Sequence, residues 1–348
     1  MNTWAIADVL RASGARVVIS NPMRTRAIAE ARVKTDKVDA LTLAQLLAAD
    51  FVPEVWAPDE EIRRLRREVA ARAALVRQRT QARNRIHAVL DRCLEDAPVA
   101  DLFGAAGRTW LAALALPEAE RAQLEATLRV HEAIEAEIEL ADRRLAEIAL
   151  ADERVDRLMS LPGVGATIAL SLIALIGGVA RFRRPAKLVG LSRPRPEGPP
   201  VRRAPSLDGE HQPRRPCPRP EPPGRSGARR VGAPGPLRAF SRRVERRRGT
   251  QVALVAVARK LAVLTWYVLT TGERYRFERA TLVRDKRNRF ARTLGQSTPR
   301  RRPAKGQPSL AVRREFELAV LAEAEAAYKA DVAKRTQKDA AAANGVQL

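Results

Sequence analysis

Two aspartates near the start of the chain have the residue type and the spacing of a metal-binding pair. Asp36 and Asp39 lie three residues apart in the segment K34-T-D-K-V-D-A40, so on a helix both carboxylates project from one face. Mg²⁺ suits such hard oxygen ligands, because it binds one or two carboxylates and completes its shell with water and phosphate oxygens. Two such ions can hold the attacking and leaving oxygens of a phosphodiester. Alternatively, one aspartate caps the helix and the other is an exposed acid that pairs with Lys34 and Lys37.

A second candidate site is the segment L161-P-G-V-G-A166, which predicts a helix-hairpin-helix turn. Gly163 and Gly165 leave backbone N–H groups open beside a helix N-terminus, where a phosphate binds readily. Basic residues follow nearby and favour contact with a DNA backbone, which gives affinity without sequence specificity: Arg181, Arg183, Arg184 and Lys187. The alternative is an ordinary tight turn between packed helices.

The composition points to a polyanionic partner. The 348 residues include 64 Lys and Arg against 40 Asp and Glu, a formal net charge of +24. An excess of this size favours nucleic acid as the partner, although a basic and merely solvated surface is the alternative.

Other classes of site and location are excluded. The two cysteines, Cys93 and Cys217, and the lack of a secretory leader favour a reducing cytosol. The longest apolar run, 166–176, is too short to span a bilayer, so no membrane role is expected. No zinc site is expected either, because no histidine has metal-ligand spacing to a cysteine.

The N-terminal elements predict a unit of α/β type. Residues 4–12 have helical periodicity, and R16-V-V-I-S-N-P22 is typical of a short buried strand that ends at Asn-Pro. Helical segments follow at 26–30 and 36–48. A lone strand is unstable, so the sheet is incomplete on its N-terminal side.

The central and C-terminal elements are predicted to be helical. Apolar residues recur every three or four positions over 59–94 and again from Leu124 to Ile148, which indicates an antiparallel coiled-coil arm or, equally, a plain bundle. Residues 251–269 predict a core helix. Residues 296–348 predict a basic linker followed by a solvated helical tail.

A Pro/Arg-rich segment interrupts these helices. It spans residues 191–234, and 13 of the 23 prolines lie between Pro194 and Pro236. We interpret it as a segment translated in the wrong reading frame and therefore disordered. The alternative is a disordered basic linker that binds nucleic acid.

Several of these motifs together resemble the insertion-sequence 110 family of bacterial transposases, also called DEDD or Piv-type recombinases. The resemblance covers roughly residues 1–190 and 235–295. It is carried by N21-P-M-R-T-R-A-I-A-E-A-R-V-K-T-D-K-V-D-A-L-T-L-A, R77-Q-R-T-Q-A-R-N-R-I-H-A-V-L, L161-P-G-V-G with G178-V-A-R-F, and V257-A-R-K-L.

The resemblance implies a fold class that is mixed α/β and mostly α. It implies a RuvC-like (ribonuclease-H-like) unit, truncated here to 1–58, a helical arm over 59–150, and a C-terminal transposase domain over 151–190 and 235–295. Asp36 and Asp39 match the third and fourth of four metal-binding acids. The first two acids belong to strands upstream of Met1, so the start of the reading frame is predicted to lie further upstream.

The resemblance also implies the chemistry. Intact relatives cleave and join DNA with Mg²⁺ and a serine nucleophile, for which no residue can be assigned here, so this chain is expected to be defective. The expected partners are insertion-sequence ends and target DNA, a guide-like structured RNA and a second copy of the chain, in the cytoplasm beside the nucleoid. A non-catalytic nucleic-acid-binding protein is the alternative. The residues expected to contact nucleic acid are Lys34, Lys37, Arg77, Arg83, Arg85, Gly163, Gly165, Arg183, Arg184 and Lys187.

Overall fold

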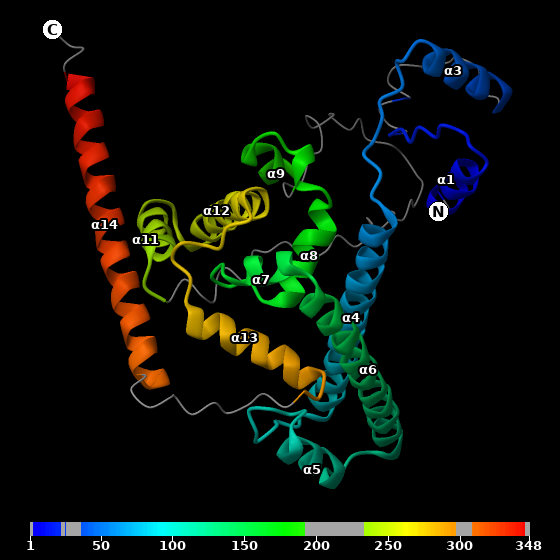
Figure 1. Cartoon of the computed structure of the whole chain (residues 1–348). Helices are drawn as coiled ribbons and strands as arrows, with labels where there is room; N and C mark the ends of the chain where they lie inside the picture. The colour runs from blue at the N-terminus through cyan, green and yellow to red at the C-terminus, as the bar shows by residue number, and fades with distance from the viewer. Residues whose placement is uncertain (1–2, 22–24, 26–35, 192–232, 297–307, 345–348) are drawn as a thin grey trace, which may run out of the picture. The chain divides into compact units, whose positions relative to one another are not determined.

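The computed structural model describes residues 3–21, 25, 36–191, 233–296 and 308–344 (Figure 1). The chain divides into two compact units, Met1–Glu61 and Ile62–Leu348, and each is described by itself below. The Pro/Arg-rich segment predicted to be out of frame lies almost entirely outside the described residues, as does the helix expected at 26–30.

The N-terminal unit contains two helices and an extended segment. Helix α1 spans Thr3–Ala12 and helix α3 spans Asp36–Ala48. The strand predicted at 16–20 is not formed: residues 16–19 have no regular secondary structure, Arg16 is exposed and 17–20 are half-buried, and Ser20 makes one isolated antiparallel bridge to Glu54.

The physical reason is a lack of pairing. Among the described residues one backbone bond accompanies the bridge, from the N–H of Val55 to the carbonyl of Ile19 at 2.7 Å, and a strand needs neighbours along its whole length. No strand occurs among the described residues, so the mixed α/β class and the RuvC-like fold stay predictions, whereas the mostly α character is confirmed.

The arm consists of two long antiparallel helices. Helix α4 spans Glu60–Cys93 and helix α6 spans Glu118–Ala151, close to the predicted bounds, and Figure 1 shows them side by side. Ion pairs join the two helices, and their residue numbers rise along α4 as they fall along α6: Glu68 with Arg144, Arg72 with Asp142, Arg79 with Glu135, and Arg92 with Glu120. These pairs set the register of the two helices.

Every seventh residue of α6 is buried along one seam. These four residues are Leu124, His131, Ile138 and Leu145, and the other buried residues of α6 are the alanines Ala141, Ala146 and Ala149. A repeat of seven is the pattern of a coiled-coil contact, so the sequence favours this pairing over a looser bundle.

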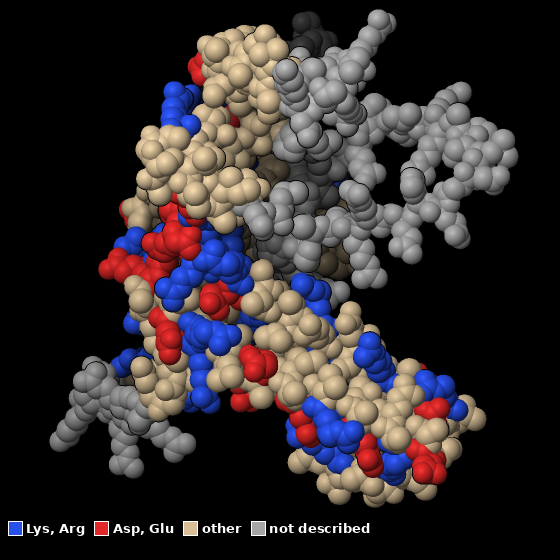
Figure 2. Space-filling view, turned by 90° about the vertical axis from the view of Figure 1, so that its right-hand side faces the viewer, with Lys and Arg blue, Asp and Glu red and all other residues tan. Residues whose placement is uncertain are grey.

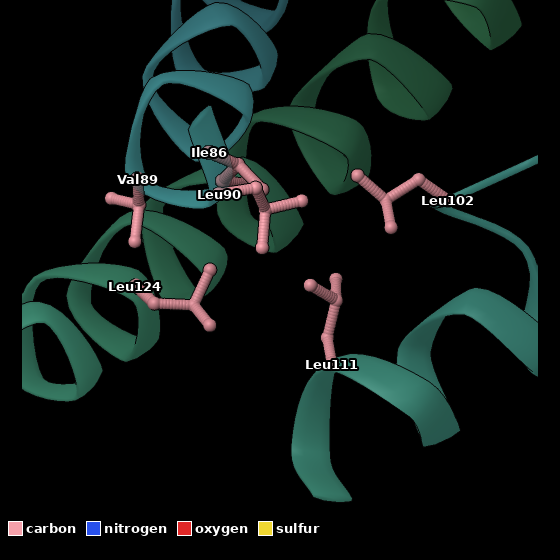
Figure 3. Packing of buried hydrophobic residues seen from close by; sticks show 6 residues of the cluster. All are labelled: Ile86, Val89, Leu90, Leu102, Leu111 and Leu124. Atoms are coloured by element: carbon pink, nitrogen blue, oxygen red, sulfur yellow. The ribbon is translucent and has the colours of Figure 1, made fainter. Parts of the chain in front are cut away.

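A small core closes the tip of the arm. Helix α5 spans Ala105–Ala113, and its Leu111 points toward Leu102, toward Ile86 on α4 and toward Leu124 on α6 (Figure 3). The start of α5 lies against the preceding loop, since a Cβ on Gly107 would stand 2.2 Å from the carbonyl oxygen of Leu102.

The remaining helices form a domain around α12. They are α7 (Glu153–Met159), α8 (Ala166–Ile176), the 3₁₀ turn η1 (Val179–Arg181), α9 (Pro185–Leu191), α11 (Pro236–Arg248), α12 (Thr250–Thr271) and α13 (Ala280–Thr293). Helix α12 packs against α11, α9 and α7, and Trp266 Nε1 donates to the carbonyl of Phe182 at 2.9 Å. The core helix predicted at 251–269 is therefore confirmed.

Among the described residues, α12 is the one helix that is long and apolar enough to cross a membrane by length and composition. The sequence predicts a core helix at 251–269, and only uninterrupted apolar runs were weighed against a membrane span, whereas Arg259 and Lys260 interrupt the run in this helix. Core helices of soluble proteins pass the same test, and buried side chains of α12 such as Val257 and Leu261 serve the core.

The C-terminal helix α14 spans Leu310–Asn344 and differs from the expected solvated tail. It packs against α11 and α13, with Leu321 and Glu325 buried. Glu325 accepts hydrogen bonds from the N–H of Gly235 at 3.1 Å and from Nε of Arg238 at 2.8 Å. The helix is therefore attached to the N-terminus of α11 by a buried carboxylate, which its Ala/Glu/Lys composition does not reveal.

Candidate nucleic-acid interface

The turn between α7 and α8 presents an open helix N-terminus. Gly163 has φ +83°, a left-handed conformation that favours glycine, and it reverses the chain after Pro162. Gly165 precedes α8 without a side-chain cap, and a Cβ there would meet no atom within 4 Å. The first N–H groups of α8 have no partner within the helix and carry its positive dipole end, which suits a phosphate oxygen.

Arginines surround this N-terminus. Residues Gly165–Ile168 line an open pocket of about 600 Å³, and the other lining residues come from the arm and from α13: Arg72, Glu139, Asp142, Arg143, Arg289, Phe290, Arg292 and Thr293. The lining is thus net positive, with four arginines against two acids.

The pocket arginines differ in their partners. Arg72 is paired with Asp142, and Arg292 donates from Nε to the carbonyl of Asn288 at 3.2 Å. Arg143 and Arg289 are exposed and make no ion pair among the described residues. The free guanidinium groups and the helix N-terminus together offer several donors to one anionic backbone.

Helix α8 is held at its other end by the arm. Nε of Arg66 on α4 donates to the carbonyl of Ala174 at 2.7 Å, at the negative end of the helix dipole. Burial lowers the pKa of Arg66, and burial followed by repulsion from Arg66 lowers the pKa of Arg181. The arm and α8 are therefore joined at the end opposite the turn.

Three residues that were predicted to contact nucleic acid lie beyond the C-terminus of α8. Arg183, Arg184 and Lys187 are exposed, but they follow the C-terminus of α8, whereas Gly163 and Gly165 precede its N-terminus. An eleven-residue helix is about 16 Å long, so the structure does not bring these two groups into one pocket.

The predicted arginines of the arm have two different environments. Arg77 and Arg85 are exposed on α4 and make no ion pair among the described residues. Arg83 instead donates to His131 at 3.0 Å and to Glu135 at 2.9 Å, and its guanidinium lies 4.4 Å from the Phe103 ring centre. Arg83 is thus a packing residue of the arm, because two of its donor nitrogens are already used.

A second basic groove lies between α11 and α12, where no contact residue was predicted. It has a volume of about 600 Å³ and is lined by Arg243, Val244, Arg247, Arg248, Gln251, Val252, Val255, Ala256 and Arg259. The run R242-R-V-E-R-R-R248 is the sequence signal that could have identified it. Figure 2 shows, on the face it draws, Lys and Arg interspersed with Asp and Glu, so basic charge there is divided among separate patches.

The predicted metal pair lies at the start of α3. Asp36 is the first residue of this helix and Asp39 is exposed, which leaves the Asp39 carboxylate open to an ion from solution. Lys34 and the side chains of Asp36 and Lys37 lie outside the described residues. Within the described part, no group of three or more His, Cys, Asp or Glu residues is placed to hold a metal. The hard-oxygen donor type fits Mg²⁺, while two carboxylates alone give a weak site.

Each of the two candidate sites lies in a segment that matches a transposase family model. Residues 2–95, which contain Asp36 and Asp39, match the DEDD transposase model of the IS110 family. Residues 155–193, which contain the turn between α7 and α8, match the model described as transposase, IS116/IS110/IS902 family. No curated protein matches the chain. The matched segments are narrower than the resemblance expected from the motifs, and both models describe transposases of the IS110 family, so over these two segments the chain is similar to that family.

Proposed function

We propose that this transposase chain holds the sugar-phosphate backbone of DNA at the turn between α7 and α8. The observation that carries the proposal is the pocket in which Gly165 and Thr167, at the N-terminus of α8, lie beside Arg143, Arg289 and Arg292. A helix N-terminus with converging guanidinium groups binds phosphate through charge and hydrogen bonds, without reading bases. The groove lined by Arg243, Arg247, Arg248 and Arg259 supplies a second contact of the same kind.

The proposed metal role belongs to the N-terminal unit. Asp36 and Asp39 hold Mg²⁺ by their carboxylates, and the ion, when bound, supplies Lewis-acid activation of a phosphodiester. The motif matches only two of the family's four acids to positions in this sequence. A polypeptide of these 348 residues is therefore expected to bind DNA without cleaving it.

The second candidate function is a nucleic-acid-binding protein that performs no strand cleavage in any form. The exposed arginines Arg77 and Arg85 on α4 favour it, because they lie far along the chain from the acids and suit an RNA or DNA backbone equally. A guide-like RNA and a second copy of the chain are proposed partners under either function.

Substitution of the acids separates the two functions. Asp36→Asn with Asp39→Asn should abolish Mg²⁺ binding, measured by isothermal titration, and should leave duplex affinity unchanged or slightly higher through lost repulsion. The matched control is Asp50→Asn, at an exposed position in the same unit. Unchanged Mg²⁺ binding in the double variant would rule out the metal role. Mg²⁺-dependent cleavage by the unmodified polypeptide would show that two acids suffice, contrary to our expectation.

A further inference from the structure

Three backbone carbonyls of the turn between α7 and α8 converge on one cation. Nζ of Lys286, on α13, donates to the carbonyl oxygens of Met159 at 2.6 Å, Leu161 at 3.3 Å and Val164 at 2.7 Å. A lysine ammonium has three N–H donors, so the number of its donors equals the number of carbonyl acceptors around it.

The turn needs positive charge at this point because of its own backbone. Met159 is the last residue of α7, so its carbonyl has no helical partner and carries part of the negative dipole end. The N–H groups of Ser160 and Leu161 turn back to the carbonyls of Arg157 and Leu158, which leaves the carbonyl of Met159 without them. Three carbonyl dipoles with their negative ends together repel one another unless a cation lies between them.

The same cation fixes the direction of the candidate phosphate donors. The peptide between Val164 and Gly165 is trans and planar, so its C=O and N–H point in opposite directions. Since the Val164 carbonyl points to Lys286, the N–H of Gly165 points away from it, toward the open side of the turn. Lys286 thereby couples the buried side of the turn to the side that faces a ligand.

We propose that the ammonium of Lys286 is a built-in monovalent cation that holds the turn in its phosphate-binding conformation. It takes the place of an ion such as K⁺, which carbonyl oxygens bind elsewhere in proteins. The turn of this chain then needs no K⁺ from solution, and removal of the ammonium leaves a carbonyl site that a monovalent cation fills. Lys286 acts through the turn, so it is a positioning residue, and its effect on DNA binding rests on the function proposed above.

The test uses the full chain with Lys286→Ala at constant ionic strength in four chloride salts: potassium, ammonium, lithium and tetramethylammonium. The control is Lys260→Ala, which removes an exposed lysine of α12. Two quantities are measured in each salt, the thermal unfolding temperature and the affinity for a short duplex by fluorescence anisotropy.

Wild type and Lys260→Ala should be indifferent to the cation, within about twofold in affinity. Lys286→Ala should have a lower unfolding temperature and at least fivefold weaker affinity in tetramethylammonium, which is too large for the site. Potassium or ammonium should restore both quantities, and lithium should restore them less.

The outcomes separate this inference from the proposed function. Rescue of the unfolding temperature by potassium without any change in duplex affinity would retain the role of Lys286 and remove the turn from the DNA-binding site. A potassium requirement in wild type, or equal behaviour of Lys286→Ala in all four salts, would overturn the inference. Lys286→Met keeps the apolar stem of the side chain. If neither Lys286→Ala nor Lys286→Met folds in any of the four salts, the inference is also overturned.

Discussion

Nε of Arg83 on α4 donates a hydrogen bond to Nε2 of His131 on α6, at 3.0 Å. The acceptor must be an unprotonated nitrogen, so the imidazole is neutral and carries its proton on Nδ1. The ring stacks on Phe103 with ring centres 4.9 Å apart, and Glu135 accepts from the same arginine at 2.9 Å. Because His131 occupies a position of the seven-residue repeat, this polar contact ties the register of the arm to one protonation state.

The arm should lose stability in mildly acidic solution. Burial, followed by the positive charge of Arg83, holds the pKa of His131 below its ordinary value of 6.5. The unfolded chain therefore binds a proton near pH 6.5 that the folded chain does not. The stabilisation is complete above that pH and decreases as the pH falls below it, by up to about 1.4 kcal/mol per pH unit.

Urea unfolding at pH 7.5 and pH 5.5 measures this effect, with His131→Gln as the variant that keeps an acceptor for Arg83 but does not titrate. We expect the difference between the two pH values to be smaller in the variant. Equal differences in the two proteins would mean that His131 is not the titrating group.

The C-terminal helix should detach in strong acid or when the Glu325 carboxylate is removed. Burial alone would raise the pKa of Glu325, but hydrogen bonds from Lys329, the N–H of Gly235 and Arg238 outweigh it and lower the pKa to about 2. This contribution to stability is present above the ordinary value of 4.5 and is lost as the pH falls toward 2.

Limited proteolysis measures the attachment of α14. Glu325→Gln should speed the proteolytic release of α14 and lower the unfolding temperature, because a neutral amide pairs more weakly with Arg238. Glu323→Gln, at an exposed position two residues away, is the control. Identical cleavage rates in the two variants would contradict the assigned role of the buried carboxylate.

The tip of the arm should not tolerate a side chain at Gly107. A Cβ there would stand 2.2 Å from the backbone oxygen of Leu102, and backbone atoms cannot rotate away as a side chain can. Gly107→Ala should destabilise the chain by about 2 kcal/mol or more in chemical unfolding. Gly178→Ala is the matched control, since a Cβ at Gly178 meets nothing within 4 Å, and a cost as large at Gly178 would argue against a steric cause.

Helical periodicity and glycine chemistry predicted much of the fold. Both arm helices followed from apolar residues every three or four positions, and the turn at Gly163 and Gly165 followed from its Pro-Gly-x-Gly pattern. Periodicity fails where one buried charge decides the contact: α14 has a composition typical of a solvated helix, yet Glu325 anchors it. The strand at 16–20 has the residue types of a strand, but only Ser20 bridges to another segment.

The candidate site was predicted less completely than the fold. The turn glycines were identified because their spacing is local, but Arg289 and Lys286 lie more than a hundred residues further along the chain. Only packing brings α13 to the turn, so no pattern near Gly165 points to them. The contact of Arg83 with His131 was not predicted, because an arginine-rich helix does not reveal which of its arginines faces a buried histidine.

Removal of arginines from the pocket at the turn between α7 and α8 should lower both the affinity for DNA and its dependence on salt. Arg289→Ala with Arg292→Ala removes two guanidinium groups beside the N-terminus of α8. Each lost phosphate contact lowers the dependence of log affinity on log salt by about 0.9. The matched control is Arg284→Ala, which removes an exposed arginine of the same helix outside the pocket.

The proposed DNA contact at the turn is measured by the affinity of the chain for a short DNA duplex as a function of salt, by fluorescence anisotropy, in wild type and these variants. We expect the double variant to bind at least tenfold more weakly and its salt slope to fall by nearly two, while Arg284→Ala changes both much less. If the double variant and the control bind alike, the turn between α7 and α8 is not where this chain holds DNA.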